Sequence, residues 1–356
     1  MMNVRKLLIL NCCLGVVCIQ TGCDINLGSW SQAKYERTVE RQAPLADGST
    51  LAAQTSHGFV TVTGADVTEC TVVAEICGRA PSEEEAQELA EQVDIELEMV
   101  GDTLTVEADK PQAGRNRSIS ISYTITVPRQ TNLECGSSYG AIEIDDIHGD
   151  VRGKTSSGSI TAENIEGSVD LHTSYGSITC KDMSEGDIRL KSSSGTIKLT
   201  NASFGRCEAH TSYGAVVCKV LTGSSIKLHS DSGSIKVTTA VSDVSDLSTS
   251  YGRITGRQLT TPDLLAKSGS GDLDIVCSDS PAGMTADLVT SYGSIDFTAP
   301  PGFGGKVDLS TSYGSVKTER PITISGKVSK KELRGTVGQG TGKLHLETGS
   351  GSISLL

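Results

Sequence analysis

Residues 169–197 read VDLHTSYGSITCKDMSEGDIRLKSSSGTI, and this stretch contains one short unit twice. Gly176 and Gly195 each follow Tyr or Ser, and an isoleucine stands two residues after each of them, at Ile178 and Ile197. The same context recurs along the chain at steps of 16 to 22 residues. The recurring glycines stand at positions 140, 158, 176, 195, 214, 233, 252, 271, 293, 314, 335 and 351. A period near 19 residues is too short for a helical hairpin, so each period predicts one coil of stacked β-structure.

Two ladders of apolar residues accompany the glycines and predict the core. The position two residues after each glycine is aliphatic in every repeat, from Ile142 to Ile353. The position five residues before it is mostly Leu or Ala, as at Leu190 and Ala209. Because side chains alternate along a strand, both ladders face inward. We therefore predict an all-β fold, a single-chain parallel β-solenoid with coils of about 19 residues, whose irregular last coils serve as a cap.

The position six residues before the glycines is charged, and its sign alternates from one repeat to the next. Seven successive repeats carry Glu134, Arg152, Asp170, Arg189, Glu208, Lys227 and Asp246 there. Stacked neighbours in such a row attract each other weakly. A slip of one residue would turn these charges into the core, so the row helps to fix the register.

The N-terminus predicts an export signal. Arg5 and Lys6 precede an apolar stretch, residues 7–19, and Cys23 follows at the spacing of a lipobox. This arrangement resembles bacterial lipoproteins, in which such a cysteine is lipidated and becomes the first residue; a cleaved signal or a membrane anchor is the alternative. We expect residues 1–22 to be a lipoprotein signal peptide. The resemblance implies a protein of the bacterial cell envelope, lipid-anchored at the periplasmic face of the inner or outer membrane or at the cell surface.

Three segments follow the predicted leader. Residues 23–48 are expected to form a polar tether without periodicity. Residues 49–128 predict a β-rich region with one short helix, which begins after the capping box at residues 82–85, and one hairpin around Gly101. Residues 129–356 predict the solenoid repeats.

Composition excludes some functions. The net charge of −12 becomes −14 without Arg5 and Lys6, since 29 basic then face 43 acidic residues, and this acidity argues against a nucleic-acid partner. Seven cysteines follow Cys23 with no C-x-x-C pair, so we expect no zinc ribbon, no metal and no cofactor. Cys180 and Cys218 fall two coils apart, about 9.6 Å, which is beyond disulfide reach, so they should be buried apolar residues.

The residue before each glycine alternates between tyrosine and serine from Tyr139 to Tyr292. The alternation fails when Tyr313 follows directly. Two interpretations are open. The rings could cover the edge of a thin core, or they could form an exposed row that binds polysaccharide. The link to the corner glycine favours packing.

A row of basic and imidazole side chains four residues before the glycines is the candidate ligand-binding site. Lys191, His210 and His229 should lie on adjacent coils of one outer face. Two imidazoles about 4.8 Å apart could hold a metal ion or, when protonated, an anion. Because the sequence shows no third ligand, solvated charge on a β-face is the alternative.

Catalytic patterns are weak. Residues 136–140 match G-x-S-x-G, but the serine recurs at repeat corners where the required strand, elbow and helix are missing, so we predict no nucleophile and no catalytic residue. A β-helix lyase or glycoside hydrolase would need clustered carboxylates on adjacent coils. Asp274 and Asp296 form the one evident stacked acidic pair, with Asp272 and Asp287 nearby.

The repeats resemble the DUF4097 family of bacterial adhesin-like, β-strand repeat-containing lipoproteins. The residues that carry the resemblance are 57–62, HGFVTV, 123–128, YTITVP, and 174–178, SYGSI. It covers residues 49–356 and implies no catalytic residue. We therefore expect a non-catalytic, lipid-anchored envelope protein, adhesin-like or scaffolding. Its partners would be the membrane, through Cys23, and envelope polysaccharide or another surface protein; a polysaccharide-acting enzyme and an envelope-stress signalling accessory are the alternatives.

Overall fold

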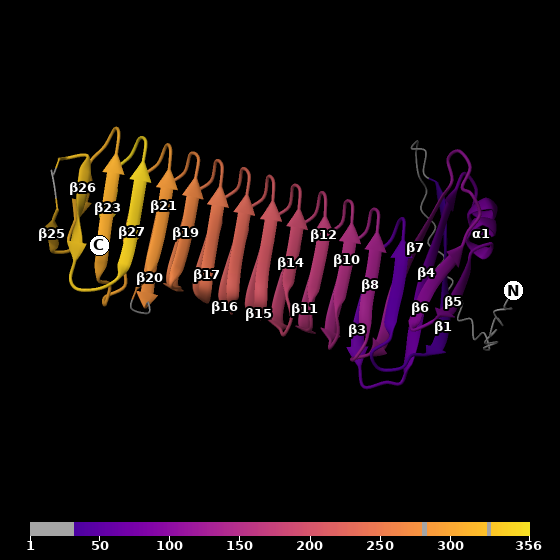
Figure 1. Cartoon of the computed structure of the whole chain (residues 1–356). Helices are drawn as coiled ribbons and strands as arrows, with labels where there is room; N and C mark the ends of the chain where they lie inside the picture. Colours follow the sequence, from indigo (N-terminus) through magenta and orange to yellow (C-terminus); the bar gives the residue numbers. More distant parts are fainter. Residues whose placement is uncertain (1–31, 280–282, 326–328) are drawn as a thin grey trace, which may run out of the picture. The chain divides into compact units, whose positions relative to one another are not determined.

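The computed structural model describes residues 32–279, 283–325 and 329–356 and divides the chain into two compact units, residues 1–158 and 159–356. Both are built almost entirely of β-strands, in agreement with the predicted fold class (Figure 1). The boundary between the two units falls after residue 158, whereas the sequence predicted that the solenoid repeats begin at residue 129. Each unit is described separately below.

Unit 1 combines an antiparallel sheet with the first parallel coils. Its elements are β1 (Ala33–Pro44), β2 (Thr50–Thr55), β3 (Val60–Ala65), β4 (Glu69–Ala80), α1 (Glu83–Glu91), β5 (Asp94–Val100), β6 (Thr103–Asp109), β7 (Ser118–Pro128), β8 (Asn132–Ser137), β9 (Ile142–Ile147) and β10 (Val151–Thr155). β4 pairs antiparallel with β1 and β7, and β5 pairs antiparallel with β6. β2 lies parallel to both β6 and β8, while β3 lies parallel to β7 and β9.

The polar tether predicted for residues 23–48 is wrong for its second half, because β1 pairs with β4 along twelve residues. Nearly every β1 side chain is partly or fully exposed, so the apolar alternation that reveals a strand is missing. Backbone pairing and two arginines hold the strand in place. The guanidinium of Arg37 donates to the carbonyl oxygen of Val93, and that of Arg41 donates to the carbonyl oxygen of Ile95.

The short helix and the hairpin are confirmed. Ser82 caps α1, and its hydroxyl accepts a hydrogen bond from the backbone N–H of Glu85 at 3.3 Å. The helix packs closely against β1 and β4, and a Cβ at Gly78 of β4 would lie 2.3 Å from the carbonyl oxygen of Ala86. Gly101 adopts a positive φ of 63° in the turn between β5 and β6.

The sequence predicted that the solenoid starts at residue 129, but the structure has a parallel coil earlier in the chain. β2 and β3 form a first coil, since they pair in register with β8 and β9 of the next coil. The repeat pattern misses this coil because β4 to β7, residues 69–128, separate it from its neighbour in the chain.

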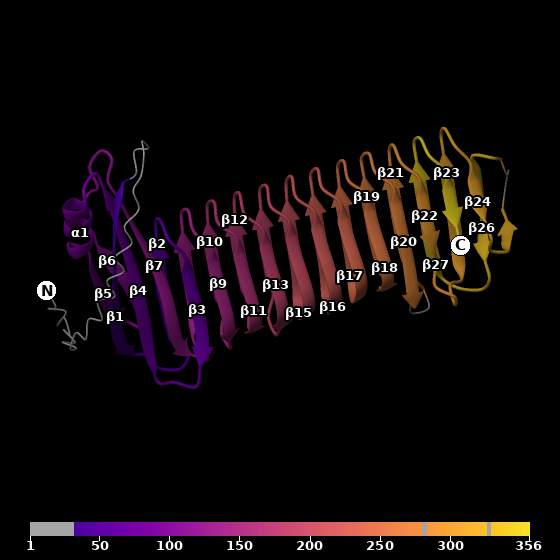
Figure 2. The same cartoon turned by 180° about the vertical axis from the view of Figure 1, so that it is seen from behind.

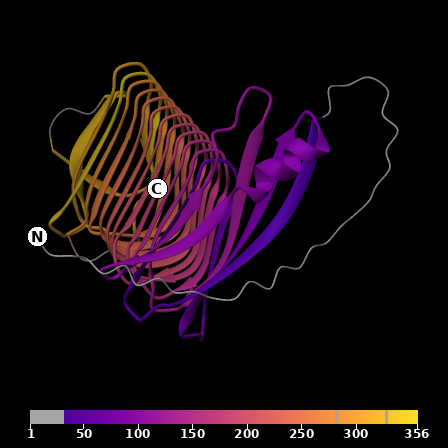
Figure 3. The same cartoon turned by 90° about the vertical axis from the view of Figure 1, so that its right-hand side faces the viewer.

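Unit 2 is a stack of coils, most of them made of two strands, whereas β15, β16 and β17 each run through both sides of a coil as one strand. Its strands are β11 (Ile160–Glu166), β12 (Val169–Thr173), β13 (Ile178–Ser184), β14 (Ile188–Ser192), β15 (Ile197–Thr211), β16 (Val216–Ser230), β17 (Ile235–Thr249), β18 (Ile254–Thr260), β19 (Asp263–Ser268), β20 (Leu273–Asp279), β21 (Thr285–Thr290), β22 (Ile295–Thr298), β23 (Gly305–Thr311), β24 (Val316–Thr318), β25 (Ile322–Ile324), β26 (Glu332–Val337), β27 (Gly342–Thr348) and β28 (Ile353–Leu355). Segments that precede a corner glycine stack on one face, and segments that follow it stack on the other (Figures 1 and 2). Viewed along the stack, each coil is a flattened loop (Figure 3).

The predicted register is confirmed in the regular coils. Ile178, Ile197, Val216 and Ile235 pair in sequence across β13, β15, β16 and β17, and all four are fully buried. The charged row lies outside, where Arg189 Nε lies 3.8 Å from Glu208 Oε2.

The coils of unit 2 do not stack in chain order at the C-terminal end. β27 lies between β21 and β23 (Figure 1), and β28 pairs with β22 on one side and β24 on the other. The predicted corner at Gly335 is wrong, because Gly335 belongs to β26, which pairs antiparallel with β23 and β25. The expectation of irregular last coils agrees with this antiparallel end.

A buried hydroxyl three residues before each corner glycine joins successive coils. Thr211 Oγ1 accepts a hydrogen bond from the N–H of Gly214 at 3.2 Å and donates one to the carbonyl oxygen of Gly195, in the preceding coil, at 2.9 Å. Ser230 makes the same two contacts with Gly233 and Gly214. A Cβ at Gly214 would lie 2.0 Å from the oxygen of Gly195, so the corner requires glycine because the coils approach closely.

Candidate functional site

The structure places the three predicted ligand-binding residues side by side on one outer face. Lys191 of β14 pairs with His210 of β15, and His210 pairs with His229 of β16. The two imidazole rings stack, with centroids 4.9 Å apart and an angle of 24° between the rings. The predicted register of this row is therefore correct; its role in binding stays a prediction.

The surroundings limit how much positive charge this row carries. Burial lowers the pKa of His210, and the neighbouring His229 lowers it further. His229 is already bonded at both ring nitrogens, because Nδ1 lies 2.9 Å from Ser248 Oγ and Nε2 lies 3.0 Å from Asp231 Oδ1. The hydrogen bond from His229 holds the pKa of Asp231 below its usual range. Across the described ranges, no group of three His, Cys, Asp or Glu side chains is arranged to hold a metal ion.

Ser248, His229 and Asp231 form a chain of contacts that resembles the residue set of a serine hydrolase. The sequence reasoning missed this set because its members are spread over two coils. It lacks two features that hydrolysis needs. Ser248 lies near the end of β17 and pairs with His229 of β16 on one side and Lys267 of β19 on the other, so its neighbouring amides are committed to the sheet and cannot form an oxyanion hole. The side chains also lie on the outer face, with Asp231 about half exposed.

The tyrosines at the corners are exposed, so the prediction that they cover the core edge is wrong. In unit 2 the exposed fraction is 69% to 78% for Tyr175, Tyr213, Tyr251, Tyr292 and Tyr313. The core needs no cover there, because the buried hydroxyl below each corner already closes the coil. In unit 1 the ring of Tyr139 stacks on His57, with centroids 5.0 Å apart.

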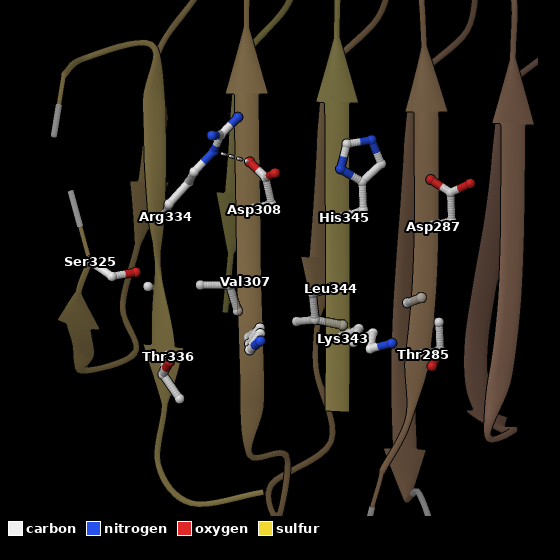
Figure 4. A pocket seen from close by; sticks show the side chains of 13 residues that line it. Thr285, Asp287, Val307, Asp308, Ser325, Arg334, Thr336, Lys343, Leu344 and His345 are labelled. Atoms are coloured by element: carbon white, nitrogen blue, oxygen red, sulfur yellow. Dashed lines mark hydrogen bonds and ion pairs between the residues drawn. The ribbon is translucent and has the colours of Figure 1, made fainter. Parts of the chain in front are cut away.

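A pocket of about 540 Å³ lies on the outer face of β21, β27, β23 and β26 (Figure 4). His345 of β27 pairs with Asp287 on one side and Asp308 on the other. Both acids have cationic partners, since Lys267 lies 3.6 Å from Asp287 and Arg334 lies 3.1 Å from Asp308. His345 Nε2 lies 3.3 Å from Glu347 Oε2, so this imidazole has acidic side chains on its own strand and on both neighbouring strands.

The acidic pair considered for catalysis is adjacent but not free. Asp274 of β20 pairs with Asp296 of β22, as the repeat pattern predicted. Arg257 forms an ion pair with Asp274 and also donates to its backbone carbonyl at 3.0 Å. Asp274 is thus engaged with a cation, which does not suit a general acid.

The family model of DUF4097, described as Toastrack, matches residues 82–219 and 182–356. The chain belongs to the DUF4097 family. This confirms the resemblance inferred from the repeats. No match to a curated protein was found.

Solved structures resemble this DUF4097 protein at low identity. A putative adhesin from Parabacteroides distasonis is 14% identical with a TM-score of 0.43, over 90% of this chain and 97% of that one. A putative adhesin from Parabacteroides merdae is 10% identical with a TM-score of 0.39, over 90% and 96% of the two chains. A putative lipid binding protein from Parabacteroides distasonis is 14% identical with a TM-score of 0.34, over 90% and 96%. Similarity at this level carries no functional information.

The cysteines of this DUF4097 chain that the structure describes are free thiols. Cys180 and Cys218 are fully buried, as predicted, and burial raises the pKa of Cys218 to about 12. The predicted lipidation site, Cys23, lies outside the described residues. None of the helices that the structure describes is long and apolar enough to cross a membrane.

Proposed function

We propose that this protein is a non-catalytic, lipid-anchored component of the bacterial cell envelope that binds an extended partner along its coils. The observation that carries the proposal is the periodic outer surface of unit 2, where paired strands hold equivalent side chains in fixed register over many coils. Such a surface presents the same group repeatedly, which suits a long adhesin-like or scaffolding contact better than a small substrate. The test is a glycan array combined with a pull-down from envelope fractions, using the mature protein; a protein that binds neither glycan nor envelope protein would contradict it.

The anchor is proposed at Cys23, because this cysteine follows Arg5, Lys6 and an apolar stretch at lipobox spacing. Cys23→Ser should leave unprocessed precursor and abolish labelling by a palmitate analogue. Cys18→Ser, within the same leader, is the matched control and should process normally. Equal labelling of the Cys23→Ser variant and the wild type would place the anchor elsewhere.

We propose Lys191, His210 and His229 as the contact for an acidic group of the partner. Lys191 supplies the permanent charge, and His210 adds charge when it is protonated. Because the pKa of His210 is lowered, this gain should appear only below about pH 6.5. Calorimetric titration with acidic glycans and with Zn²⁺ at two pH values tests the row. Binding of acidic glycan that is unchanged in the His210→Ala/His229→Ala double variant would exclude it.

A hydrolase is the second candidate, and the contacts among Ser248, His229 and Asp231 are the observation that favours it. The missing oxyanion hole makes it the weaker candidate. Release of methylumbelliferone from its acetate and butyrate esters, together with polysaccharide depolymerisation, provides the assay. We expect the wild type and Ser248→Ala to be equally inactive. Turnover that disappears in Ser248→Ala would replace the binding function with an enzymatic one.

A further inference from the structure

The tyrosines of unit 2 form a row whose regularity appears only in space. In stack order, the residues before the corner glycines are Tyr175, Ser194, Tyr213, Ser232, Tyr251, Ser270, Tyr292, Ser350 and Tyr313. The inserted coil of β27 and β28 supplies Ser350 and restores the alternation that the chain order breaks. Backbone hydrogen bonds fix this order. The N–H of Ser350 donates to the carbonyl oxygen of Ser291 at 2.9 Å, and the N–H of Tyr313 donates to the carbonyl oxygen of Gly349 at 3.0 Å.

The spacing of this tyrosine row is set by the sheet. Adjacent coils lie about 4.8 Å apart, so rings on every second coil repeat at about 9.6 Å. The serines between them leave a gap beside each ring. An extended β-linked polysaccharide advances by a similar length for every two sugars, so alternate sugars of such a chain would meet successive rings.

The chemistry around the rings also suits a neutral polyol. The four corner residues around each tyrosine read SYGS at 174–177, SYGA at 212–215 and SYGR at 250–253. Across the nine corners of unit 2 the charged residues at these four positions are Asp231, Arg253 and Asp272. Arg253 pairs with Asp272, and Asp231 accepts a hydrogen bond from His229. Apolar ring faces beside hydroxyl groups match the C–H faces and hydroxyls of a sugar.

Two other partner classes fit less well. An extended peptide that adds a strand needs unpaired backbone groups. The corner amides are already paired from coil to coil; for example, the N–H of Tyr213 donates to the carbonyl oxygen of Ser193 at 3.0 Å. A flat apolar protein surface needs a continuous apolar patch, whereas serine interrupts the rings at Ser194 and Ser232. The observations therefore favour a carbohydrate chain.

We propose that the tyrosine row binds a linear, extended β-linked polysaccharide along the stack, with alternate sugars lying against successive rings. The proposal rests on the binding function proposed above, and it adds a second contact row, separate from Lys191, His210 and His229, with its own ligand class. Tyr313 is the last ring of the row, and the ammonium of Lys331 lies 5.5 Å from the centre of its ring. The other rings of the row are Tyr175, Tyr213, Tyr251 and Tyr292.

The experiment measures binding of cellohexaose and chitohexaose, and of their two-sugar forms, by calorimetry. At least one hexasaccharide should bind more tightly than its disaccharide, because it spans more than one ring. The Tyr213→Ala/Tyr251→Ala/Tyr292→Ala variant should weaken that binding by about a hundredfold, roughly fivefold for each ring. Its melting temperature should be unchanged, since the rings are 69% to 73% exposed.

The decisive variant is Ser232→Tyr, which fills the gap between Tyr213 and Tyr251. It should reduce hexasaccharide binding because it removes the two-coil spacing, although it adds an aromatic ring. Ser232→Ala and Val241→Ala, both at exposed positions, are the matched controls and should bind like the wild type. Tighter binding by Ser232→Tyr, or equal binding of α-linked dextran, would mean a non-specific aromatic surface and would overturn the proposal. Absence of any glycan binding in a protein that still captures an envelope protein would overturn this proposal while leaving the binding function intact.

Discussion

At the residue scale, the hydroxyl three residues before each corner glycine explains how the coils fit together. One oxygen closes its own corner by accepting from the glycine N–H and joins the preceding coil by donating to a glycine carbonyl. Either Thr or Ser can occupy this position because both carry that oxygen, as at Ser192, Thr211, Ser230 and Thr249. Both bonded groups belong to backbone that is shielded from water, so losing the hydroxyl leaves them unsatisfied.

Thr211→Val keeps the shape of the side chain and removes both hydrogen bonds. We expect the free energy of unfolding to fall by about 2–4 kcal/mol, since an amide and a carbonyl lose their partner. Thr200→Val, on the outer face of the same strand, is the control and should change stability by less than about 0.5 kcal/mol. Urea unfolding measures both, and equal stability of the two variants would exclude the coil-joining role.

The lowered pKa of His210 makes folding stability depend on pH. The unfolded state binds a proton on this histidine near pH 6.5, whereas the folded state binds it only at lower pH, so this contribution to stability falls as pH drops from about 6.5 towards the folded pKa. NMR titration should give His210 a pKa below 6.5. In His229→Ala that pKa should rise part of the way back, since burial, the larger cause, remains. A pKa of His210 that is unchanged by His229→Ala would exclude the interaction between the rings.

At the scale of the element, each coil combines an inward aliphatic ladder with a second turn of fixed conformation. The residue six positions after the corner glycine has a positive φ in successive coils, and most are Asn or Asp, which tolerate it. Asn164 has a φ of 53°, Asp182 of 55° and Asn201 of 55°. Val220 occupies this position with a φ of 55°, where a β-branched side chain is strained.

Val220→Asn should therefore stabilise unit 2 by about 1 kcal/mol. The exposed valine side chain contributes little packing that could be lost, because it is 49% exposed. The melting temperature and urea midpoint measure the change. Val241→Asn, which replaces an exposed valine whose φ is not positive, is the control and should bring no gain. A loss of stability in Val220→Asn would contradict the assigned turn conformation.

Ile197→Asp tests the aliphatic ladder, because it places a charge without a partner in a fully buried position. We expect a loss of several kcal/mol, which is enough to unfold a marginal stack. Lys198→Ser, at the exposed neighbour, should cost less than about 0.5 kcal/mol. Equal losses of melting temperature at the two sites would refute the register.

The sequence predicts the coils well because period and inward alternation are local properties, as at Ile197 and Lys198. It does not predict β1, since Lys34, Glu36 and Thr38 show no apolar alternation in a strand held mainly by its backbone. It also does not predict the exposure of the tyrosines, because proximity to a glycine does not say on which side of the corner a ring lies. The neighbours of Lys191, His210 and His229 along the row follow from the period, but the bonds of His229 to Ser248 and Asp231 depend on side-chain orientation.

At the scale of the whole chain, the order in which the coils stack cannot be predicted from the repeat pattern. Every coil offers equivalent rows to its neighbours, so the period alone cannot say that β27 lies between β21 and β23. Side chains at the insertion supply the missing information. His345 separates Asp287 from Asp308, and Ser350 separates Tyr292 from Tyr313.

His345→Asp should destabilise the inserted coil, because it creates three acidic side chains on adjacent strands. The side chain of His345 is 44% exposed, so we expect a modest loss of about 0.5–1 kcal/mol that weakens at high salt. His345→Lys places a permanent cation between the acids and should be at least as stable as the wild type. Thermal unfolding at low and high salt measures both variants. Equal stability of the two at low salt would show that charge does not contribute to the stacking order.

The order in which the last coils are synthesised differs from their order in the stack. β23 and β24 are synthesised before β27 and β28, yet they lie beyond them in the finished stack. A nascent chain therefore passes through a stage in which β23 can dock directly on β21, as a strictly sequential stack would. That arrangement brings Asp287 against Asp308, an acidic pair that the finished stack separates with His345. The final order of the coils is therefore reached only after β27, the later strand in the chain, has entered between two earlier ones.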